Sequence, residues 1–185
     1  MKSASIKGSA LFVAIGGFRV VPIENFANLF ARVSAAVNSE QFQLFDAEKI
    51  AGWNHLYMAA VNAVKRIDNG TAISNNLPVE TLLTASCQDQ ITKSFEVLGV
   101  NNSTRSLALI VFADSLLDAE KAFMRVEEKL GHVDDAVLQM SSSKYEILKK
   151  LFGIKELEIK ALEKEASEAL TNILVERGAL LSLNR

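Results

Sequence analysis

The chain contains one cysteine, two histidines and two prolines among its 185 residues. Because Cys87 is the single cysteine, no intramolecular disulfide can form. A structural zinc site needs four nitrogen or sulfur ligands, so Cys87, His55 and His132 are too few, and we expect neither a metal nor another cofactor. With two prolines and no low-complexity tract there is no evident linker, and we predict one domain over residues 1–185.

Long hydrophobic runs are also missing. The longest stretch free of Asp, Glu, Lys and Arg covers residues 50–64, which is too short to span a bilayer. The apolar run at residues 10–15 is shorter than the core of a signal peptide. We therefore expect a cytoplasmic protein that does not contact a membrane.

The net charge of the chain is small, and the sequence contains no glycine motif of the kind that binds phosphate. A net charge of −2 gives no overall attraction to nucleic acid, so any RNA contact must come from a local basic patch. Gly16 and Gly17 follow an apolar run, but neither G-x-G-x-x-G nor G-K-S/T follows them. We interpret this glycine pair as a turn.

Apolar runs without alternation are typical of strands that are covered on both faces. Such strands are predicted at residues 10–15 and 106–112, with weaker candidates at 41–45 and 136–139. Helical periodicity marks residues 22–33, 50–67, 116–130 and 143–153, and a long helix is expected over 155–177 with a Glu156–Lys160 pair. The pattern predicts an α/β fold, with α+β as an alternative, built on a small mixed sheet with a helical C-terminal extension at about 141–185.

The segment at residues 77–100 predicts two short helices joined by a tight corner. Pro78 suits the first helical turn, where its missing N–H has no cost, and Glu80 follows it. Ser86 and Asp89 have the spacing of a cap for the second helix. Gly99 is expected in the left-handed conformation that ends that helix.

These helices carry a resemblance to a known family. The chain reads His55-Leu56-Tyr57-Met58-Ala59 with Ala63, then Glu80-Thr81-Leu82-Leu83, then Gln90-Ile91-Thr92-Lys93-Ser94 up to Gly99. Near the end it reads Gly153-Ile154-Lys155-Glu156-Leu157-Glu158 and Glu176-Arg177-Gly178-Ala179-Leu180-Leu181, where Gly178 replaces the apolar residue usual in the family. This order of motifs over residues 10–181 resembles the small subunit of the KEOPS complex, the PRPK-binding protein family, and we interpret the chain as an archaeal member.

The resemblance implies a non-catalytic subunit. The KEOPS complex forms threonylcarbamoyladenosine on tRNA, and the family member binds its small atypical kinase and helps recruit tRNA through the 3′ CCA end. No small-molecule substrate is implied. The RNA-binding candidates are His55, Lys65, Arg66, Gln90 and Lys93, and the kinase-interface candidates are Ile154, Leu157 and Ala161.

Each candidate also has a simpler interpretation. His55 can pair with backbone or with Glu80, Lys65 and Arg66 can offset the dipole of a helix end, and the apolar C-terminal residues can be core. Two other functions remain open at this point. One is a small α/β enzyme that uses Cys87 and a histidine. The other is a protein-interaction adaptor without RNA binding.

Overall fold

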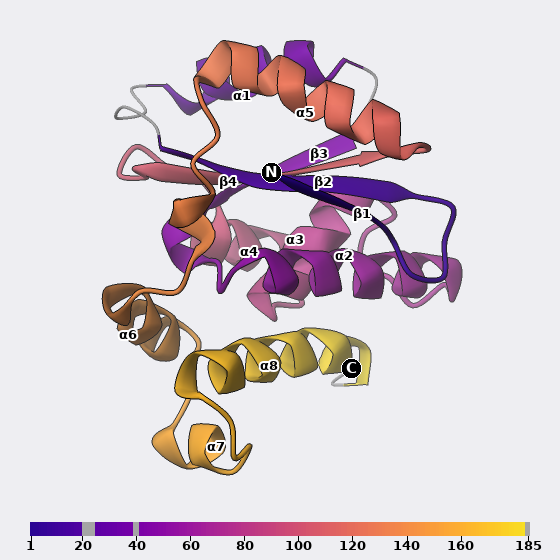
Figure 1. The fold of residues 1–185 in the computed structure, drawn as a ribbon. Helices are drawn as coiled ribbons and strands as arrows, with labels where there is room; N and C mark the ends of the chain where they lie inside the picture. The colour runs from indigo at the N-terminus through magenta and orange to yellow at the C-terminus, as the bar shows by residue number, and fades with distance from the viewer. Residues whose placement is uncertain (20–24, 39–40, 184–185) are drawn as a thin grey trace.

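The computed structural model describes residues 1–19, 25–38 and 41–183. Its strands β1 (Lys2–Ser5), β2 (Phe12–Arg19), β3 (Gln41–Asp46) and β4 (Ser106–Ala113) form one sheet in the order β1-β2-β4-β3 (Figure 1). The predicted α/β class is confirmed, but the prediction of a mixed sheet is wrong because every neighbouring pair is antiparallel. β2 and β3 run in the same direction, and β4 lies between them and opposes both.

Three predicted strands are confirmed as β2, β3 and β4, one predicted strand is absent, and one observed strand, β1, was not predicted. β1 was missed because its sequence carries no apolar pattern. Residues 136–139 lie instead in or beside a 3₁₀ helix, η2 (Asp135–Leu138). Gly16 and Gly17 are not a turn but part of β2, where a Cβ on Gly17 would lie 2.3 Å from Val137 Cγ2. These glycines let η2 and α5 pack directly on the strand.

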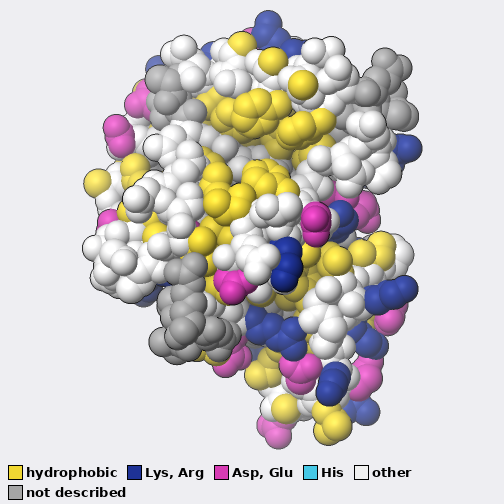
Figure 2. All heavy atoms as spheres, turned by 180° about the vertical axis from the view of Figure 1, so that it is seen from behind, with side chains coloured by type: hydrophobic (Ala, Val, Ile, Leu, Met, Phe, Trp, Pro, Cys, Tyr) yellow, Lys and Arg dark blue, Asp and Glu magenta, His cyan; other side chains and the backbone are white. Residues whose placement is uncertain are grey.

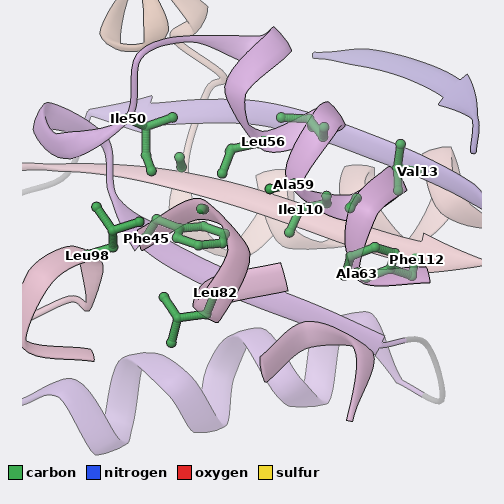
Figure 3. Close-up of a cluster of buried hydrophobic side chains, with 14 of the residues drawn as sticks. Val13, Phe45, Ile50, Leu56, Ala59, Ala63, Leu82, Leu98, Ile110 and Phe112 are labelled. Carbon is green, nitrogen blue, oxygen red and sulfur yellow. The ribbon is translucent and has the colours of Figure 1, made fainter. Parts of the chain in front are cut away.

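Helices cover both faces of the sheet (Figure 1). One face carries α1 (Phe26–Val37) and α5 (Leu116–Leu130), and the other carries α2 (Trp53–Asp68), α3 (Leu77–Ser86) and α4 (Ile91–Leu98). Pro22 and Ile23, predicted at the start of the first helix, lie outside the described residues. Along β4, Leu107 and Leu109 enter the α1–α5 core, whereas Ile110 and Phe112 enter the α2–α4 core shown in Figure 3. Every residue of β4 is buried, as its continuous apolar run predicted.

The corner between α3 and α4 differs from its sequence prediction. Asn76 caps α3, and Pro78 lies in its first turn as expected. Ser86 is not a cap but the last residue of α3, and Gln90 precedes α4 without a side-chain cap. Gly99 has an ordinary φ of −67°, and the left-handed residue is Cys87 with a φ of 55°. The tight corner itself is confirmed, with Cys87 turning the chain.

The C-terminal extension contains α6 (Ser142–Leu151), α7 (Glu156–Lys160), α8 (Ala166–Ala179) and η3 (Leu180–Leu183). The single long helix predicted over 155–177 is wrong. Glu165 caps α8 by accepting from the backbone N–H groups of Ser167 and Glu168, so a new helix begins there. Glu156 pairs with Lys149 rather than with Lys160.

α8 lies beneath the α2–α4 layer, on its side away from the sheet (Figure 1). Its contacts with α2 and α3 and with α6 and α7 enclose a third apolar cluster, to which Leu148, Ile154, Leu170 and Leu174 contribute. The extension therefore forms a further layer of helices and leaves part of its apolar surface open. Among the described residues, no helix combines the length and apolar character needed to cross a membrane.

Candidate partner-binding surface

Residues of α4 line two surface hollows. The first, here called the α4–α8 hollow, is lined by Cys87, Gln88, Val97, Leu151, Phe152, Arg177, Leu180 and Leu181. The second, here called the β3 groove, is lined by Phe26, Phe30, Gln41, Phe42, Gln43, Leu44, Asn76, Pro78, Val79, Phe95 and Val100. Figure 2 shows apolar side chains gathered across the face opposite that of Figure 1, with Lys and Arg side chains toward its lower part. Contiguous exposed apolar surface of this kind marks interaction sites.

The α4–α8 hollow is lined by Arg177, which is held in place by hydrogen bonds, and by partly exposed apolar side chains. Arg177 donates to the backbone oxygen of Phe152 at 2.7 Å and to Glu158 Oε2 at 2.6 Å, which fixes the end of α8 against the turn after α6. Of the apolar side chains, Leu180 is 41% exposed and Leu151 is 37% exposed. Ile147, one helical turn before Leu151, is also exposed. These side chains present apolar area that the fold leaves uncovered.

The three predicted kinase-interface residues differ in their exposure to solvent. Ile154 is 4% exposed and belongs to the core of the extension, so it is not a surface anchor. Leu157 is 80% exposed on α7, and Ala161 is exposed just after it. The sequence prediction did not include Val97, Leu151 and Leu180, which line the α4–α8 hollow. The spacing of Ile147 and Leu151 gives a signal for Leu151 alone.

The five predicted RNA-binding residues do not form one surface. Gln90 and Lys93 are exposed at the start of α4, and Lys65 is exposed in the last turn of α2. His55 and Arg66 are buried, so their side chains are not presented to a ligand. The prediction of a contiguous polar face that includes His55 and Arg66 is therefore wrong for those two residues.

His55 joins α2 to the end of α3. Its Nδ1 accepts from the backbone N–H of Ala51 at 3.2 Å, so the proton is on Nε2, which donates to the backbone oxygen of Ala85 at 3.0 Å. Burial lowers the pKa of His55 from 6.5 to about 4. His55 is thus a neutral core histidine, in agreement with the backbone-pairing interpretation.

Arg66 is the centre of a buried polar cluster. Its Nε donates to Glu80 Oε1 at 2.7 Å, and its other nitrogens donate to Thr84 Oγ1 and, at 3.0 Å, to the backbone oxygen of Gly178. The second oxygen of Glu80 accepts from the backbone N–H groups of Ile73 and Ser74. One ion pair therefore ties together α2, α3, α8 and the loop before α3.

Cys87 does not have the features of a nucleophile. Burial raises the pKa of its thiol from 9.0 to about 12, and the nearby Arg177 only partly opposes this. The thiol donates to the backbone oxygen of Leu174 at 3.5 Å. His55, whose two nitrogens are occupied by Ala51 and Ala85, is not available as its base. The thiol is therefore protonated at neutral pH, and His55 has no free ring nitrogen with which to accept its proton.

Lys144 is a buried charge that no local pattern in the sequence reveals. Its side chain is 1% exposed, and Nζ donates to the backbone oxygen of Val137 at 2.7 Å. Burial lowers its pKa from 10.5 to about 8, and the carboxylates of Glu48 and Asp46 oppose this lowering. Lys144 fixes α6 to the 3₁₀ helix η2 rather than facing a ligand.

Among the described residues, no buried side-chain nitrogen or oxygen lacks a hydrogen-bond partner. Polar groups that are committed to the fold, together with apolar side chains gathered at surface hollows, define a class of protein that binds partners. Comparison with known proteins agrees with this class. The model of the family described as "Kinase binding protein CGI-121" matches residues 20–182, so the chain belongs to this family.

A curated relative supports the assignment. The chain is 23% identical over 128 residues to the "Regulatory protein Cgi121" of the archaeon Methanocaldococcus jannaschii, and the match covers 65% of this chain and 80% of the relative. The family identification made from the sequence motifs is confirmed.

Proposed function

We propose that this chain is a non-catalytic, cytoplasmic subunit of a KEOPS complex that binds the complex's atypical kinase and helps recruit tRNA through its 3′ CCA end. The observation that carries the proposal is the family match, because it covers residues 20–182 of a kinase-binding family. A subunit that holds both partners raises the local concentration of tRNA near the catalytic subunit without any chemistry of its own.

The kinase surface that we favour is the α4–α8 hollow. It retains the sequence-based expectation that the C-terminal third binds the kinase, and it replaces the buried Ile154 with the exposed Leu151 and Leu180. Leu157 and Ala161 on and after α7 form the second candidate surface. Apolar anchors that enter a partner's pocket commonly dominate the affinity of an interface.

The two surfaces are distinguished by matched charge substitutions. We expect Leu180→Glu and Leu151→Glu to weaken binding of the purified chain to its cognate kinase by roughly thirtyfold, as expected for the loss of an interface anchor. Leu117→Glu on α5, which changes an exposed leucine far from the hollow, should leave binding unchanged. Binding that tolerates both hollow substitutions but is lost with Leu157→Glu would move the interface to α7.

Support for the tRNA role comes from the family resemblance and from the exposed Gln90 and Lys93 at the start of α4. A single-stranded RNA end offers unstacked bases and few phosphates, so a protein of net charge −2 can bind it with two or three cations. Lys65 is a third exposed candidate, on a different helix.

The tRNA role is tested by comparing intact tRNA with tRNA that lacks the CCA end. We expect weaker binding after trimming and a shallow salt slope of roughly −1.5 to −2. Lys93→Glu and Lys65→Glu should weaken binding, whereas Lys160→Glu, an exposed control on α7, should not. Equal affinity for the two RNAs would reject end recognition, and no binding to either would favour a protein adaptor without an RNA role.

The enzyme alternative rests on Cys87, whose raised pKa and buried hydrogen bond argue against it. We expect the purified chain to show no kinase, ATPase or hydrolase turnover. Turnover that depends on the protein and is lost in Cys87→Ala would restore the enzyme hypothesis.

A further inference from the structure

The two edge strands of the sheet, β1 and β3, differ in how far their backbone groups are protected by other parts of the fold. β1 is short, and side chains from α2 reach two of its backbone oxygens: Trp53 Nε1 donates to Lys2 at 3.5 Å, and Tyr57 Oη donates to Ser5 at 2.9 Å. β3 is longer, and within the described residues it pairs only with β4, with one of its backbone oxygens, that of Leu44, accepting from Gln43 Nε2 of the same strand at 3.1 Å. An open edge strand presents free N–H and C=O groups to another chain, and proteins usually protect such edges. β3 is therefore the edge at which the fold can accept another strand.

The β3 groove encloses this edge between two apolar walls. On one wall the rings of Phe26 and Phe30 lie 6.0 Å apart, and the ring of Phe30 lies 5.1 Å from that of Phe42. The opposite wall carries Val79 of α3 and Phe95 of α4. Figure 2 shows apolar side chains gathered on this face of the molecule. A strand laid along β3 would have an apolar neighbour on each of its two faces.

The charge of the groove restricts what can occupy it. Its polar lining consists of the carboxamides of Gln41, Gln43 and Asn76, and no charged side chain belongs to the lining described. Nucleic acids and anionic lipid headgroups need cations at the contact. Asn76 Oδ1 already accepts from the backbone N–H of Val79, and Gln43 Nε2 donates to the backbone oxygen of Leu44. The remaining carboxamide atoms and a strand edge complement the neutral amide groups of a peptide backbone.

We propose that the β3 groove binds an extended, uncharged segment of another protein, which adds a fifth strand to the sheet at β3 and packs apolar side chains against both walls. This is strand addition, in which backbone hydrogen bonds give affinity and side-chain pockets give specificity. The site goes beyond the proposed kinase surface but adjoins it. Phe95 and Val97 of the same helix α4 line the groove and the α4–α8 hollow respectively. A partner on the hollow can thus extend a segment into the groove.

The test uses the full-length chain, labelled with ¹⁵N, and a synthetic peptide probe. The probe has a core of about five alternating Val and Thr residues, the usual length of a strand, between terminal lysines that keep it soluble. We expect chemical-shift changes at the backbone amides of Gln41, Gln43 and Leu44 and slower hydrogen exchange at the outer edge of β3. A control peptide with proline in place of the central valine lacks the needed N–H group and should bind at least tenfold more weakly.

Two protein variants tie the effect to the groove. Phe30→Lys on one wall and Val79→Lys on the other should each reduce peptide affinity roughly tenfold, whereas Leu117→Lys on α5 should leave it unchanged. Kinase binding should survive Phe30→Lys, so failure of this inference and failure of the proposed function give different results. Unchanged β3 amides at millimolar peptide would overturn the proposal. So would groove binding of an ACCA RNA oligonucleotide without peptide binding, or dimerisation of the chain through β3.

Discussion

Two of the contacts that join the C-terminal extension to the rest of the protein contain a buried cation, and these two contacts are here called joints. At the first joint, Arg66 of α2 donates to Glu80, Thr84 and the backbone oxygen of Gly178 in α8. At the second, Lys144 of α6 reaches the backbone oxygen of Val137, and its nearest carboxylates act only at a distance. The first cation is paired and makes three hydrogen bonds, whereas the second makes one hydrogen bond and has no direct counter-ion among the described residues.

The paired Arg66 and the unpaired Lys144 illustrate two different effects of a buried charge on stability. Removing a partner from a close pair leaves an uncompensated charge and is strongly destabilising, although the pair itself adds little net stability. A buried lysine with a lowered pKa is itself a destabilising feature at neutral pH, because its charged form has lost its hydration. We therefore expect the Arg66–Glu80 joint to be sensitive to breakage and the Lys144 joint to tolerate, or gain from, loss of its charge.

The largest effect is expected for Glu80→Ala. The substitution leaves Arg66 buried without its counter-charge and removes the acceptor of the Ile73 and Ser74 N–H groups. We expect the free energy of unfolding to fall by about 3–5 kcal/mol, measured by urea denaturation monitored by circular dichroism.

The matched control is the double variant Arg66→Met with Glu80→Leu, which removes both charges and keeps apolar volume in the joint. It should recover a large part of the stability lost in Glu80→Ala. If Glu80→Ala loses less than about 1 kcal/mol, the joint is not a tightly coupled pair and its contrast with Lys144 disappears.

The next effect is expected for Gly178→Val, which restores the residue type usual in the family motif. A Cβ at this position would lie 2.5 Å from the backbone oxygen of Thr84, so α8 and α3 would have to move apart. That movement also displaces the carbonyl that Arg66 binds. We expect a loss of about 2–3 kcal/mol in the same assay, as for an overpacked core. An unchanged midpoint would show that the close approach of α3 and α8 is not needed.

Gly178 also shows how far the sequence could predict the fold. Its departure from the family pattern was visible in the sequence, but the reason is the backbone of α3, which lies far from it along the chain. Elements with local signals were predicted, such as β4 with its continuous apolar run. β1, with the sequence Lys-Ser-Ala-Ser, was not, because it becomes a strand only by pairing with β2.

The candidate site residues divide in the same way, into those whose exposure follows from local sequence and those whose burial depends on tertiary packing. Gln90, Lys93 and Lys65 lie on the exposed helical surface, as their positions in the pattern predicted. His55 and Arg66 lie on the side of α2 that meets α3, and their partners Ala85 and Glu80 belong to α3. The periodicity of a sequence shows which residues share one face of a helix. It does not show which neighbouring helix packs against that face. The split of the predicted long helix into α7 and α8 has a similar cause, since Arg177 holds Glu158 across the break.

A smaller effect, of opposite sign, is expected for Lys144→Met. Lowering of the Lys144 pKa from 10.5 to about 8 means that burial of the charged lysine reduces the free energy of unfolding by about 3 kcal/mol at neutral pH. Methionine keeps much of the packing and removes the charge, but it loses the hydrogen bond to Val137. We therefore expect a net gain of about 1–2 kcal/mol at pH 7, measured by urea denaturation.

The pH dependence gives an independent check on Lys144. Between about pH 8 and pH 9 the unfolded chain retains the lysine proton that the folded protein has released, so wild-type stability should rise with pH in this window; above pH 9 the raised pKa of the Cys87 thiol acts in the opposite direction. Lys144→Met should lack that rise, whereas Lys160→Met, an exposed control, should retain it. A wild-type protein with the same slope as Lys144→Met, or a variant that is clearly less stable at pH 7, would contradict the assignment of Lys144 as an uncompensated charge.

The smallest effect is expected for Leu157→Lys on α7, away from both joints. The side chain is 80% exposed, so the substitution removes little buried area. The free energy of unfolding should change by less than about 0.5 kcal/mol, and the circular dichroism spectrum should be unchanged. This result would show that the stability of the C-terminal extension depends on its two joints and not on the outer surface of α7. A loss above about 1 kcal/mol at low protein concentration would mean that Leu157 is covered within the monomer, and a loss that grows with protein concentration would mean that a second copy covers it.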